Sequence, residues 1–420
     1  MSKTINLIAS ENVASPAVRE AMVCDFHNRY AEGWPGERVY AGCKYIDQVE
    51  LLTVELAKKI FNAEFVDVRP ISGVVANLIV YTAFTEPGDV MMALSIPCGG
   101  HISTGKKELW GTAGAVHGLN VEYFPYDIDE LNIDVDATIK KIKVLKNENK
   151  PIKLLMFGAS VFPFPHPVKE IAPIAHDFGI TVAYDAAHVL GLIAGGIFQD
   201  PLREGVDVIS ASTHKTLPGP QHGMIISWNK YSDLIKKSSF PGLLSNHHLH
   251  NVAALCIALS EVAQFGKEYA IQIVRNAKAL AQALHERGFK VLGEKKGFTE
   301  SHVILIDTVA SCGIGGREAE RKLEDSNIIV NRNLLPYDLK IYKRHYTDPG
   351  GIRLGTAEVT RLGMKASDME IIADFITDVL IKDKSSDEVS KNVAEFRKNF
   401  KKCHYCFDSI REAYEYVKLR

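Results

Sequence analysis

Short apolar, β-branched runs alternate with segments of helical periodicity from about Glu55 to Trp228. The runs at residues 180–184 and 206–210 are mostly apolar, which is typical of strands that are buried on both faces of a parallel sheet. The alternation of strand-like and helix-like segments predicts a mainly parallel sheet with helices on both faces. This α/β region forms the first and larger part of the chain.

A long Ala-rich segment of helical periodicity, residues 251–288, leads into a second alternating region. That region begins at Lys290 and contains apolar runs at 303–307 and 328–330, which predicts a smaller α/β domain packed on the first. After Ile381 the composition turns charged, and a polar helical tail is expected. The predicted units are therefore an N-terminal arm (1–27), a large domain (28–250), a small domain that includes the connecting helix (251–380) and the charged helical tail (381–420).

Two ionisable side chains follow the predicted strands of the large domain. Asp185 comes directly after the run 180–184, and Lys215 lies in Ser212-Thr213-His214-Lys215-Thr216, just after the run 206–210. Ligands of open α/β sheets gather at the carboxyl ends of the strands. A lysine amine can form a Schiff base with the aldehyde of pyridoxal phosphate, and an aspartate can keep its pyridine nitrogen protonated. Either residue alone would more often be a surface lysine or a capping aspartate, but together they indicate a pyridoxal phosphate site.

A Ser-Gly turn supplies an anchor for the cofactor phosphate. Ser72 and Gly73 follow a strand-like run and open a segment of helical pattern. The free amide groups at a helix N-terminus bind phosphate without a basic side chain. Most Ser-Gly pairs only cap a helix, so this assignment depends on the order of phosphate turn, aspartate and lysine along the chain.

Composition narrows the class of protein. The 420 residues are 46% hydrophobic and carry a formal net charge of -2, which is typical of a globular enzyme with two or more domains and argues against a nucleic-acid binder. No apolar stretch approaches the roughly 18 residues needed to span a membrane, so a cytoplasmic protein without a membrane partner is expected. The seven irregularly spaced cysteines are expected to be reduced thiols. Cys403-His-Tyr-Cys406 has the spacing of half a zinc site, but no second Cys-x-x-Cys completes it, so no metal is expected.

Ordered motifs along nearly the whole chain resemble the serine hydroxymethyltransferase family. The matching segments are residues 7–12, 28–36, 39–42, 72–73, 99–101, 185–191, 213–220, 331–336 and 351–356. Two further segments, Phe162-Pro-Phe-Pro-His166-Pro and Ser245-Asn-His-His-Leu-His250, resemble the archaeal branch. The resemblance implies a fold-type I pyridoxal phosphate transferase, with a mainly parallel seven-stranded sheet between helices and a smaller C-terminal α/β domain. It also implies transfer of the serine hydroxymethyl group to a tetrahydropterin, which leaves glycine.

The resemblance assigns roles to residues around the cofactor. Lys215 would hold pyridoxal phosphate, Asp185 would keep the pyridine nitrogen charged, and His188 would lie beside the phenolic edge. Arg353 would bind the substrate carboxylate as a two-pronged clamp, with support from Ser10. Further cofactor contacts are expected at Ser72, Gly73, Thr213 and Gly242.

Other residues are expected to handle the substrate hydroxyl and the pterin. Glu32 would exchange a proton at the hydroxyl, because cleavage of the serine Cα–Cβ bond requires an acid or base there. Tyr30, a cofactor contact, and Tyr40, a catalytic and substrate contact, flank it. The resemblance implies that Tyr30, Glu32 and Tyr40 reach the site from a neighbouring subunit, as in a homodimer with shared active sites. Without the resemblance, the simpler interpretation of Glu32 would be a solvated loop carboxylate. His214 would shape the pocket, and Asn333 would meet the pterin ring.

Three positions depart from the family. Cys98 stands where most members are expected to stack a histidine on the cofactor ring, so its polarizable sulfur would cover the ring instead. Val74 replaces a serine near the phosphate, and Gln221 replaces an arginine near the cofactor. Together these changes predict weaker cofactor retention. The segment 337–348, which contains three basic residues and a histidine, is either a flap over a carboxylated pterin tail or a solvated loop.

Three functions remain open from the sequence. The first is serine hydroxymethyltransferase, with tetrahydrofolate or a tetrahydromethanopterin-type carrier as cosubstrate. The second is a pterin-independent aldolase or transaldolase that acts on threonine-like β-hydroxy amino acids, which the altered ring position at Cys98 motivates. The third is a non-catalytic paralogue, which the presence of Lys215, Asp185 and Arg353 disfavours.

Overall fold

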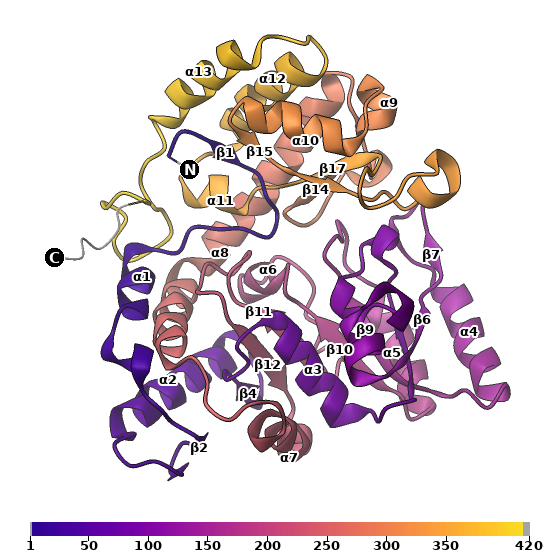
Figure 1. Ribbon diagram of the computed structural model, residues 1–420, viewed down its shortest axis with the longest axis vertical. Helices are drawn as coiled ribbons and strands as arrows, with labels where there is room; N and C mark the ends of the chain where they lie inside the picture. The colour runs from indigo at the N-terminus through magenta and orange to yellow at the C-terminus, as the bar shows by residue number, and fades with distance from the viewer. Residues whose placement is uncertain (1, 415–420) are drawn as a thin grey trace.

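A seven-stranded sheet forms the centre of the larger, lower lobe in Figure 1. The computed structural model describes residues 2–414 of the chain. Neighbouring strands are parallel except around β12, which is antiparallel to both of its neighbours. The strands in spatial order are β4 (Phe65–Asp67), β12 (Gly223–Ser227), β11 (Val208–Ser212), β10 (Thr181–Asp185), β9 (Ile152–Gly158), β5 (Val90–Ala93) and β6 (Asn120–Tyr123). The predicted mainly parallel, seven-stranded sheet is confirmed.

Both faces of this sheet are covered by helices because its strands are apolar on both sides. Along β9, Leu154 and Met156 belong to one hydrophobic core, whereas Leu155 and Phe157 belong to the other. This alternation follows the two-residue period of a strand. The first core is completed by α3 (Gly73–Phe84) and α7 (Ser232–Lys237). The second is completed by α2 (Lys44–Phe61), α4 (Val135–Asn147), α5 (Val168–Asp177), α6 (Leu190–Ala194) and the first part of α8 (Leu249–Glu286).

Helix α8 joins the two lobes. Its early residues, such as Leu255 and Leu259, pack in the large lobe, whereas Leu280 and Leu284 pack in the small one. The helix predicted over 251–288 is therefore present, with bounds shifted by two residues. By length and composition α8 is apolar enough to cross a membrane, but 61% of its most apolar window is buried within the fold, as expected of a core helix.

The small, upper lobe is built on a four-stranded antiparallel sheet. Its strands in spatial order are β13 (Lys290–Val291), β14 (Val303–Asp307), β17 (Gly351–Gly355) and β16 (Asn331–Asn333). Packed on this sheet are α9 (Thr308–Cys312) and α10 (Gly316–Asp325). The lobe is completed by α11 (Ala357–Arg361), α12 (Ala366–Leu380) and α13 (Ser386–Arg397), which contact α8, α10 or β1. The strand predicted at 328–330 lies outside this sheet, because β15 (Ile328–Ile329) pairs in parallel with β1 (Ile5–Asn6).

The two ends of the described chain meet on one side of the molecule (Figure 1). The N-terminal segment contains β1 and α1 (Pro16–Met22), and it crosses from the small lobe to the large one. The expected helical tail is helical only in α13; beyond it, Cys403, Cys406 and Ala413 pack against Val13 and Leu362 in a small apolar cluster. Residues 415–420 of that tail lie outside the described residues.

Candidate functional site

A cavity of about 220 Å³ opens where β10 and β11 end. Lys215, Asp185 and His188 line it, together with Ser72 and Gly73 at the start of α3. These residues come from separate segments of the chain, and the parallel strands bring them to one edge of the sheet. The predicted meeting of Lys215 with Asp185 is therefore observed.

The Lys215 side chain is buried, and this burial lowers the pKa of its amine to about 8. The nearby Asp185 carboxylate opposes this shift by favouring the charged amine, and Arg353 adds to it by repulsion. The Lys215 carbonyl accepts a hydrogen bond of 2.6 Å from Asn12 Nδ2, which fixes the backbone of the loop. An amine of this kind is partly neutral near pH 7 and can act as a nucleophile.

Asp185 is fixed by a hydrogen-bond network that the sequence did not reveal. Its carboxylate accepts from Asn77 Nδ2 at 3.0 Å and from the Ala187 amide at 2.9 Å. Asn77 in turn donates to Ser103 Oγ at 2.9 Å and accepts from Ser210 Oγ at 2.5 Å. The side chain of Asp185 is only 7% exposed, so the network holds a buried carboxylate in one orientation at the cavity.

The start of α3 fits closely against the end of β11. Ser72 caps the helix, because its Oγ accepts from the Val75 amide at 3.2 Å. A Cβ atom at Gly73 would lie 2.3 Å from Ser212 Oγ, so a larger residue there would displace the Ser212 hydroxyl. Val74 also lines the cavity, which leaves backbone amides, rather than a hydroxyl at that position, to face a bound anion.

Two buried histidines stack beside the cavity. His188 and His302 have ring centroids 5.5 Å apart, and His188 Nδ1 lies 3.3 Å from His302 Nε2. Burial lowers the pKa of His188 well below its usual range and that of His302 to about 3, so both rings are neutral at physiological pH. His302 also contacts the Ala9 carbonyl, at 3.1 Å. No motif in the sequence pointed to His302.

Arg353 on β17 brings a buried guanidinium from the small lobe. Its Nε donates to Asn331 Oδ1 at 3.1 Å and its Nη1 to the Ser160 carbonyl at 3.0 Å. Burial lowers the pKa of Arg353 to about 10, and within residues 2–414 no carboxylate forms an ion pair with it. A buried cation with only neutral partners suits an incoming carboxylate.

His101, rather than Cys98, lines the cavity. Its Nδ1 lies 2.7 Å from Ser103 Oγ, and burial lowers its pKa. Cys98 instead packs against the large core. The turn between them depends on Gly99, which has a φ of +97° and would bring a Cβ atom to 2.0 Å from the Val161 carbonyl oxygen. The expectation that Cys98 covers the ring thus gains no support from this geometry.

Two of the expected site residues and one position that departs from the family lie around a second cavity, of about 590 Å³. Ser10, Gln221 and His214 line this second cavity, and His214 lines the first as well. Burial lowers the pKa of His214 to about 4, and its Nδ1 is buried without a hydrogen-bond partner in the described part of the chain. Thr213 is fully buried, and its hydroxyl donates to the Pro220 carbonyl at 2.8 Å. In this structure Thr213 therefore shapes the Lys215 loop.

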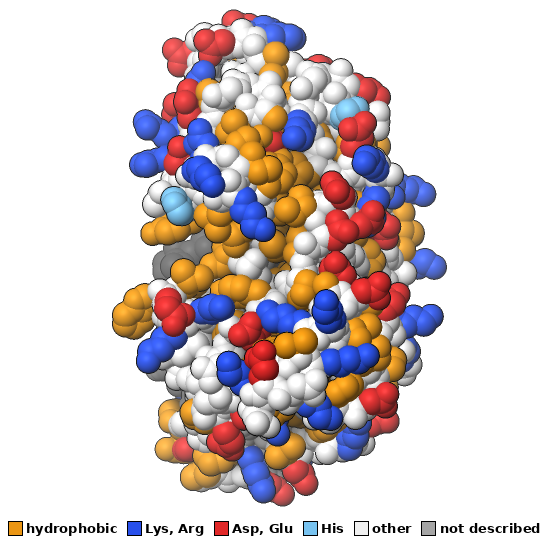
Figure 2. Space-filling model, turned by 90° about the vertical axis from the view of Figure 1, so that its right-hand side faces the viewer, with side chains coloured by type: hydrophobic (Ala, Val, Ile, Leu, Met, Phe, Trp, Pro, Cys, Tyr) orange, Lys and Arg blue, Asp and Glu red, His pale blue; other side chains and the backbone are white. Residues whose placement is uncertain are grey.

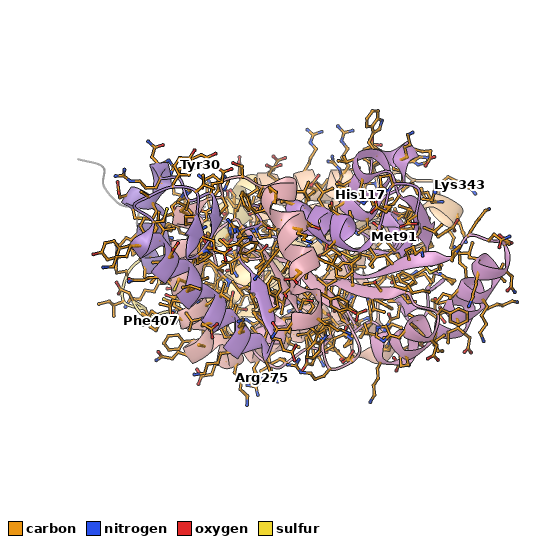
Figure 3. The ribbon with its side chains drawn as sticks, turned by 90° about the horizontal axis from the view of Figure 1, so that it is seen from below. Tyr30, Met91, His117, Arg275, Lys343 and Phe407 are labelled. Carbon is orange, nitrogen blue, oxygen red and sulfur yellow. The ribbon has the colours of Figure 1, made fainter. Side chains whose placement is uncertain are left out.

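Tyr30, Glu32, Tyr40 and Gly242 do not line the Lys215 cavity of their own chain. Tyr30 and Tyr40 are 45% and 47% exposed, and their ring centroids are 4.7 Å apart. They flank a short hairpin of β2 (Gly33–Trp34) and β3 (Glu37–Arg38), and Tyr30 lies at the periphery of the molecule in Figure 3. The half-buried Glu32 carboxylate has no hydrogen-bond or ion-pair partner among residues 2–414.

Asn333 ends β16, and its Nδ2 donates to the Leu334 carbonyl at 2.6 Å. The segment that follows it borders an apolar groove of about 590 Å³, in which Leu334 and Tyr346 face Ile102 and Trp110 of the large lobe. Figure 2 shows hydrophobic side chains gathered across the waist between the lobes. Two residues that line the groove, Ile102 and Leu334, directly follow His101 and Asn333 in the sequence.

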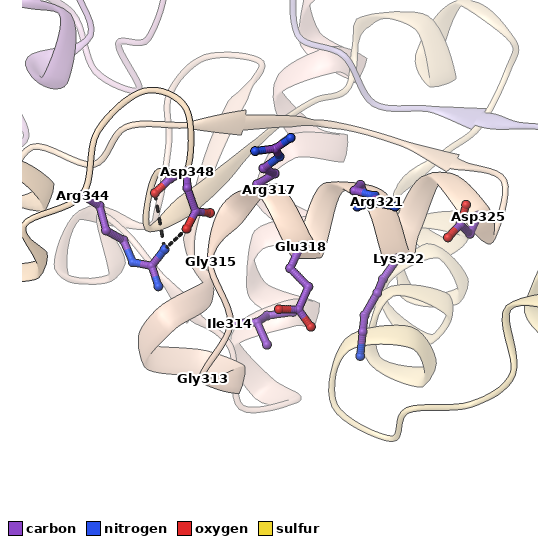
Figure 4. A pocket seen from close by; sticks show the side chains of 10 residues that line it. All are labelled: Gly313, Ile314, Gly315, Arg317, Glu318, Arg321, Lys322, Asp325, Arg344 and Asp348. Atoms are coloured by element: carbon purple, nitrogen blue, oxygen red, sulfur yellow. Dashed lines mark hydrogen bonds and ion pairs between the residues drawn. The ribbon is translucent and has the colours of Figure 1, made fainter.

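A further cavity, of about 640 Å³, lies at the start of α10 (Figure 4). Arg344 and Asp348 form an ion pair of 2.5 Å at its rim, and Arg317 and Arg321 project from the helix. Its glycines Gly313 and Gly315 lie in the turn between α9 and α10, and Asp307 caps the short α9 directly after β14.

Comparison with known proteins gives one consistent result. The family model described as serine hydroxymethyltransferase matches residues 1–376. A serine hydroxymethyltransferase of Nitrosopumilus maritimus is 57% identical over 417 residues, which cover 99% of this chain and 94% of the relative. Those of Korarchaeum cryptofilum and Methanocaldococcus jannaschii are 56% and 52% identical, and they cover 98% and 100% of this chain and 95% of each relative.

Proposed function

We propose that the Lys215 cavity is the active site, since this chain belongs to the serine hydroxymethyltransferase family. Members of this family are pyridoxal phosphate-dependent one-carbon transferases with the fold-type I architecture. The comparisons support reversible transfer of the serine hydroxymethyl group to a tetrahydropterin, and they do not support the aldolase alternative. The observation that carries the proposal is the buried Lys215 amine with the fixed Asp185 carboxylate in the same cavity.

The residues of the cavity fit pyridoxal phosphate. Lys215 offers an amine with a lowered pKa to the aldehyde, and Asp185 offers a fixed carboxylate to the pyridine nitrogen. The amides at the start of α3, next to Ser72 and Gly73, offer a phosphate site. When bound, the cofactor supplies an electron sink for negative charge on the substrate α-carbon. His188 is the proposed neighbour of the phenolic edge.

Arg353 is the proposed anchor for the substrate carboxylate. Its buried guanidinium lacks an acidic partner in the described chain, and a bidentate carboxylate would supply one. Ser10 and His214, at the adjoining cavity, would limit the space around the bound amino acid. His101 is proposed as the side chain that packs against the cofactor ring, in place of Cys98.

The active unit is proposed to be a homodimer with shared sites. The Glu32 carboxylate, which has no partner in the described chain, and the exposed rings of Tyr30 and Tyr40 lie outside their own chain's cavity, which supports this proposal. Glu32 would exchange a proton at the substrate hydroxyl, while Tyr40 would contact the substrate. Tyr30 and Gly242 would complete the neighbour's cofactor site.

The cosubstrate is proposed to be tetrahydrofolate or tetrahydromethanopterin, with Asn333 near the pterin ring, and the enzyme is proposed to act in the cytoplasm. The test is to incubate the cofactor-loaded protein with serine and each carrier in turn, and to measure glycine. Glycine that forms only with a tetrahydropterin supports the proposal, and the preferred carrier identifies the cosubstrate. Glycine and acetaldehyde from allo-threonine, with no effect of either pterin on serine, would favour the aldolase alternative.

A further inference from the structure

A pair of cysteines lies in a closed loop of the tail, beyond the residues that the family model matches. Cys403 and Cys406 are 0% and 4% exposed, and Cys406 Sγ lies 3.3 Å from the Cys403 carbonyl oxygen. A bridge between Lys402 and Glu412 closes the loop. Tyr405, between the two cysteines, has a φ of +58°, a left-handed conformation that tightens the turn. The family model matches residues 1–376, so the two cysteines lie outside the segment that it describes.

The surroundings of Cys403 favour its thiolate. The neighbouring Cys406 thiol lowers the pKa of Cys403 to about 7, and the buried Arg361 guanidinium assists. Arg361 is held by an ion pair of 2.9 Å with Glu261. At Cys98, Cys256 and Cys312, by contrast, burial raises the pKa of the thiol. Cys403 is the one cysteine of the seven for which a lowered pKa is resolved, and thiolates are the reactive form.

Direct contacts connect this loop to the Lys215 loop. The Tyr405 ring packs on Tyr269, with centroids 5.1 Å apart, and the Tyr269 hydroxyl lies 2.9 Å from Asn12 Nδ2. Asn12 also donates to the Lys215 carbonyl at 2.6 Å. On a parallel route, Arg361 donates to the Tyr405 carbonyl at 2.6 Å and to the Val13 carbonyl at 3.3 Å. The loop is therefore linked to the backbone that positions Lys215 by a continuous series of packed and hydrogen-bonded groups.

We propose that Cys403 and Cys406 form a peroxide-sensitive dithiol, and that its oxidation to a disulfide loosens the Asn12 contact with the Lys215 loop. The Cys403 thiolate attacks one oxygen of a peroxide; the O–O bond breaks, and the leaving oxygen takes up a proton to give water when the oxidant is hydrogen peroxide. The Cys406 sulfur then attacks the resulting sulfenic sulfur; an S–S bond forms, the S–O bond breaks, and a second water leaves with the Cys406 proton. Two thiols lose two electrons and the peroxide gains them. A dithiol reductant reverses the change.

The loop that holds the two buried thiols lies at the surface of the molecule. Phe407 and Ile410, in the same loop, are 52% and 79% exposed. A disulfide would form in place of the hydrogen bond from the Cys406 thiol to the Cys403 carbonyl, so the backbone of the turn that contains Tyr405 is expected to shift. The Tyr405 carbonyl and ring are the groups that contact Arg361 and Tyr269.

The experiment treats the cofactor-loaded protein with limiting hydrogen peroxide and maps its peptides by mass spectrometry. We expect a Cys403–Cys406 disulfide, seen as the loss of two hydrogen atoms, to form about tenfold faster than oxidation of Cys256. Dithiothreitol should restore the thiols. In parallel, the rate at which pyridoxal phosphate is lost on dialysis should rise roughly 2- to 30-fold in the oxidised protein. The mapping itself needs no cofactor, so its result is separate from that of the proposed active site.

Two variants complete the test. Cys406→Ser should stop the reaction at a Cys403 sulfenic acid that dimedone labels, and peroxide should then leave cofactor loss unchanged. Cys256→Ser, a buried cysteine of α8, is the matched control and should behave like the unaltered chain. Oxidation of Cys403 and Cys406 no faster than that of Cys256 would overturn the dithiol assignment. A disulfide that forms without any change in cofactor loss would overturn the connection to Lys215.

Discussion

The Lys215 cavity and the Tyr30–Tyr40 segment differ in how much of their environment one chain provides. In the cavity, Asp185 and Arg353 are 7% and 8% exposed, and each is held by hydrogen bonds from the same chain. In the segment, both tyrosines are nearly half exposed and the Glu32 carboxylate has no partner in residues 2–414. One chain thus orders the Lys215 cavity by itself, whereas the segment with Glu32, which we propose serves a neighbouring subunit, lacks comparable contacts in the described chain.

The largest expected effect is at the centre of the cavity. Lys215→Ala should abolish turnover, because no other described amine lines the cavity to hold the cofactor covalently. Glycine formation from serine is the measurement. Lys230→Ala, at a lysine whose side chain is 65% exposed, is the control and should retain full activity. Near-normal multiple turnover by Lys215→Ala would remove this lysine from the mechanism.

The next largest effect is expected at Glu32, in the exposed segment. Glu32→Gln should slow serine cleavage by about two to four orders of magnitude while glycine binding is largely kept, since a positioned acid or base contributes about that much. Steady-state rates and a glycine titration separate the two quantities. Glu37→Gln, at an exposed carboxylate in the same hairpin, should have little effect. Equal loss in both variants would mean that the hairpin is disturbed as a whole.

The pH dependence of cofactor capture tests whether burial lowers the pKa of Lys215. Only the neutral Lys215 amine attacks the aldehyde, and its pKa is about 8 instead of 10.5. The rate of covalent capture by the cofactor-free protein should therefore rise about tenfold per pH unit below 8 and level off above it. Asp185→Asn removes the charge that raises the pKa of Lys215, so the midpoint should move to lower pH. A midpoint near 10.5 in the unaltered chain would contradict the burial of the amine.

The smallest effects distinguish the two candidates for the ring neighbour. His101→Ala should increase the dissociation constant of pyridoxal phosphate about 2- to 10-fold, the usual contribution of one aromatic contact. Cys98→Ala should leave it nearly unchanged, because the thiol packs on the core instead of lining the cavity. Cofactor titration followed by absorbance measures both. A larger increase for Cys98→Ala than for His101→Ala would instead support the prediction from the sequence that Cys98 covers the cofactor ring.

The sequence predicted best where one local pattern decides the structure. The buried strand at 303–307 was predicted with its bounds, because an apolar, β-branched run has few other solutions. The pairing of β15 with β1 was missed, since strands of two residues leave no periodic signal and their partners are more than 300 residues apart.

At the site, the sequence identified the residues that carry chemistry but not those that orient them. Lys215 and Asp185 stand at strand ends, where their types and spacing are informative. Asn77 and His302 act through contacts with segments distant in sequence, so no motif marks them. Whether His101 or Cys98 faces the cavity depends on the left-handed turn at Gly99, which a periodic pattern does not predict.

The most direct test of a site shared between subunits is to mix two inactive variants. Lys215→Ala and Glu32→Gln are unfolded together, refolded as a mixture, and assayed for glycine formation from serine and a tetrahydropterin. If each site uses Lys215 of one subunit and Glu32 of its partner, random pairing makes half of the dimers mixed, and one of their two sites is intact. The account predicts recovery of about a quarter of the activity of the unaltered enzyme refolded in the same way. Activity no higher than the average of the two variants alone would contradict it.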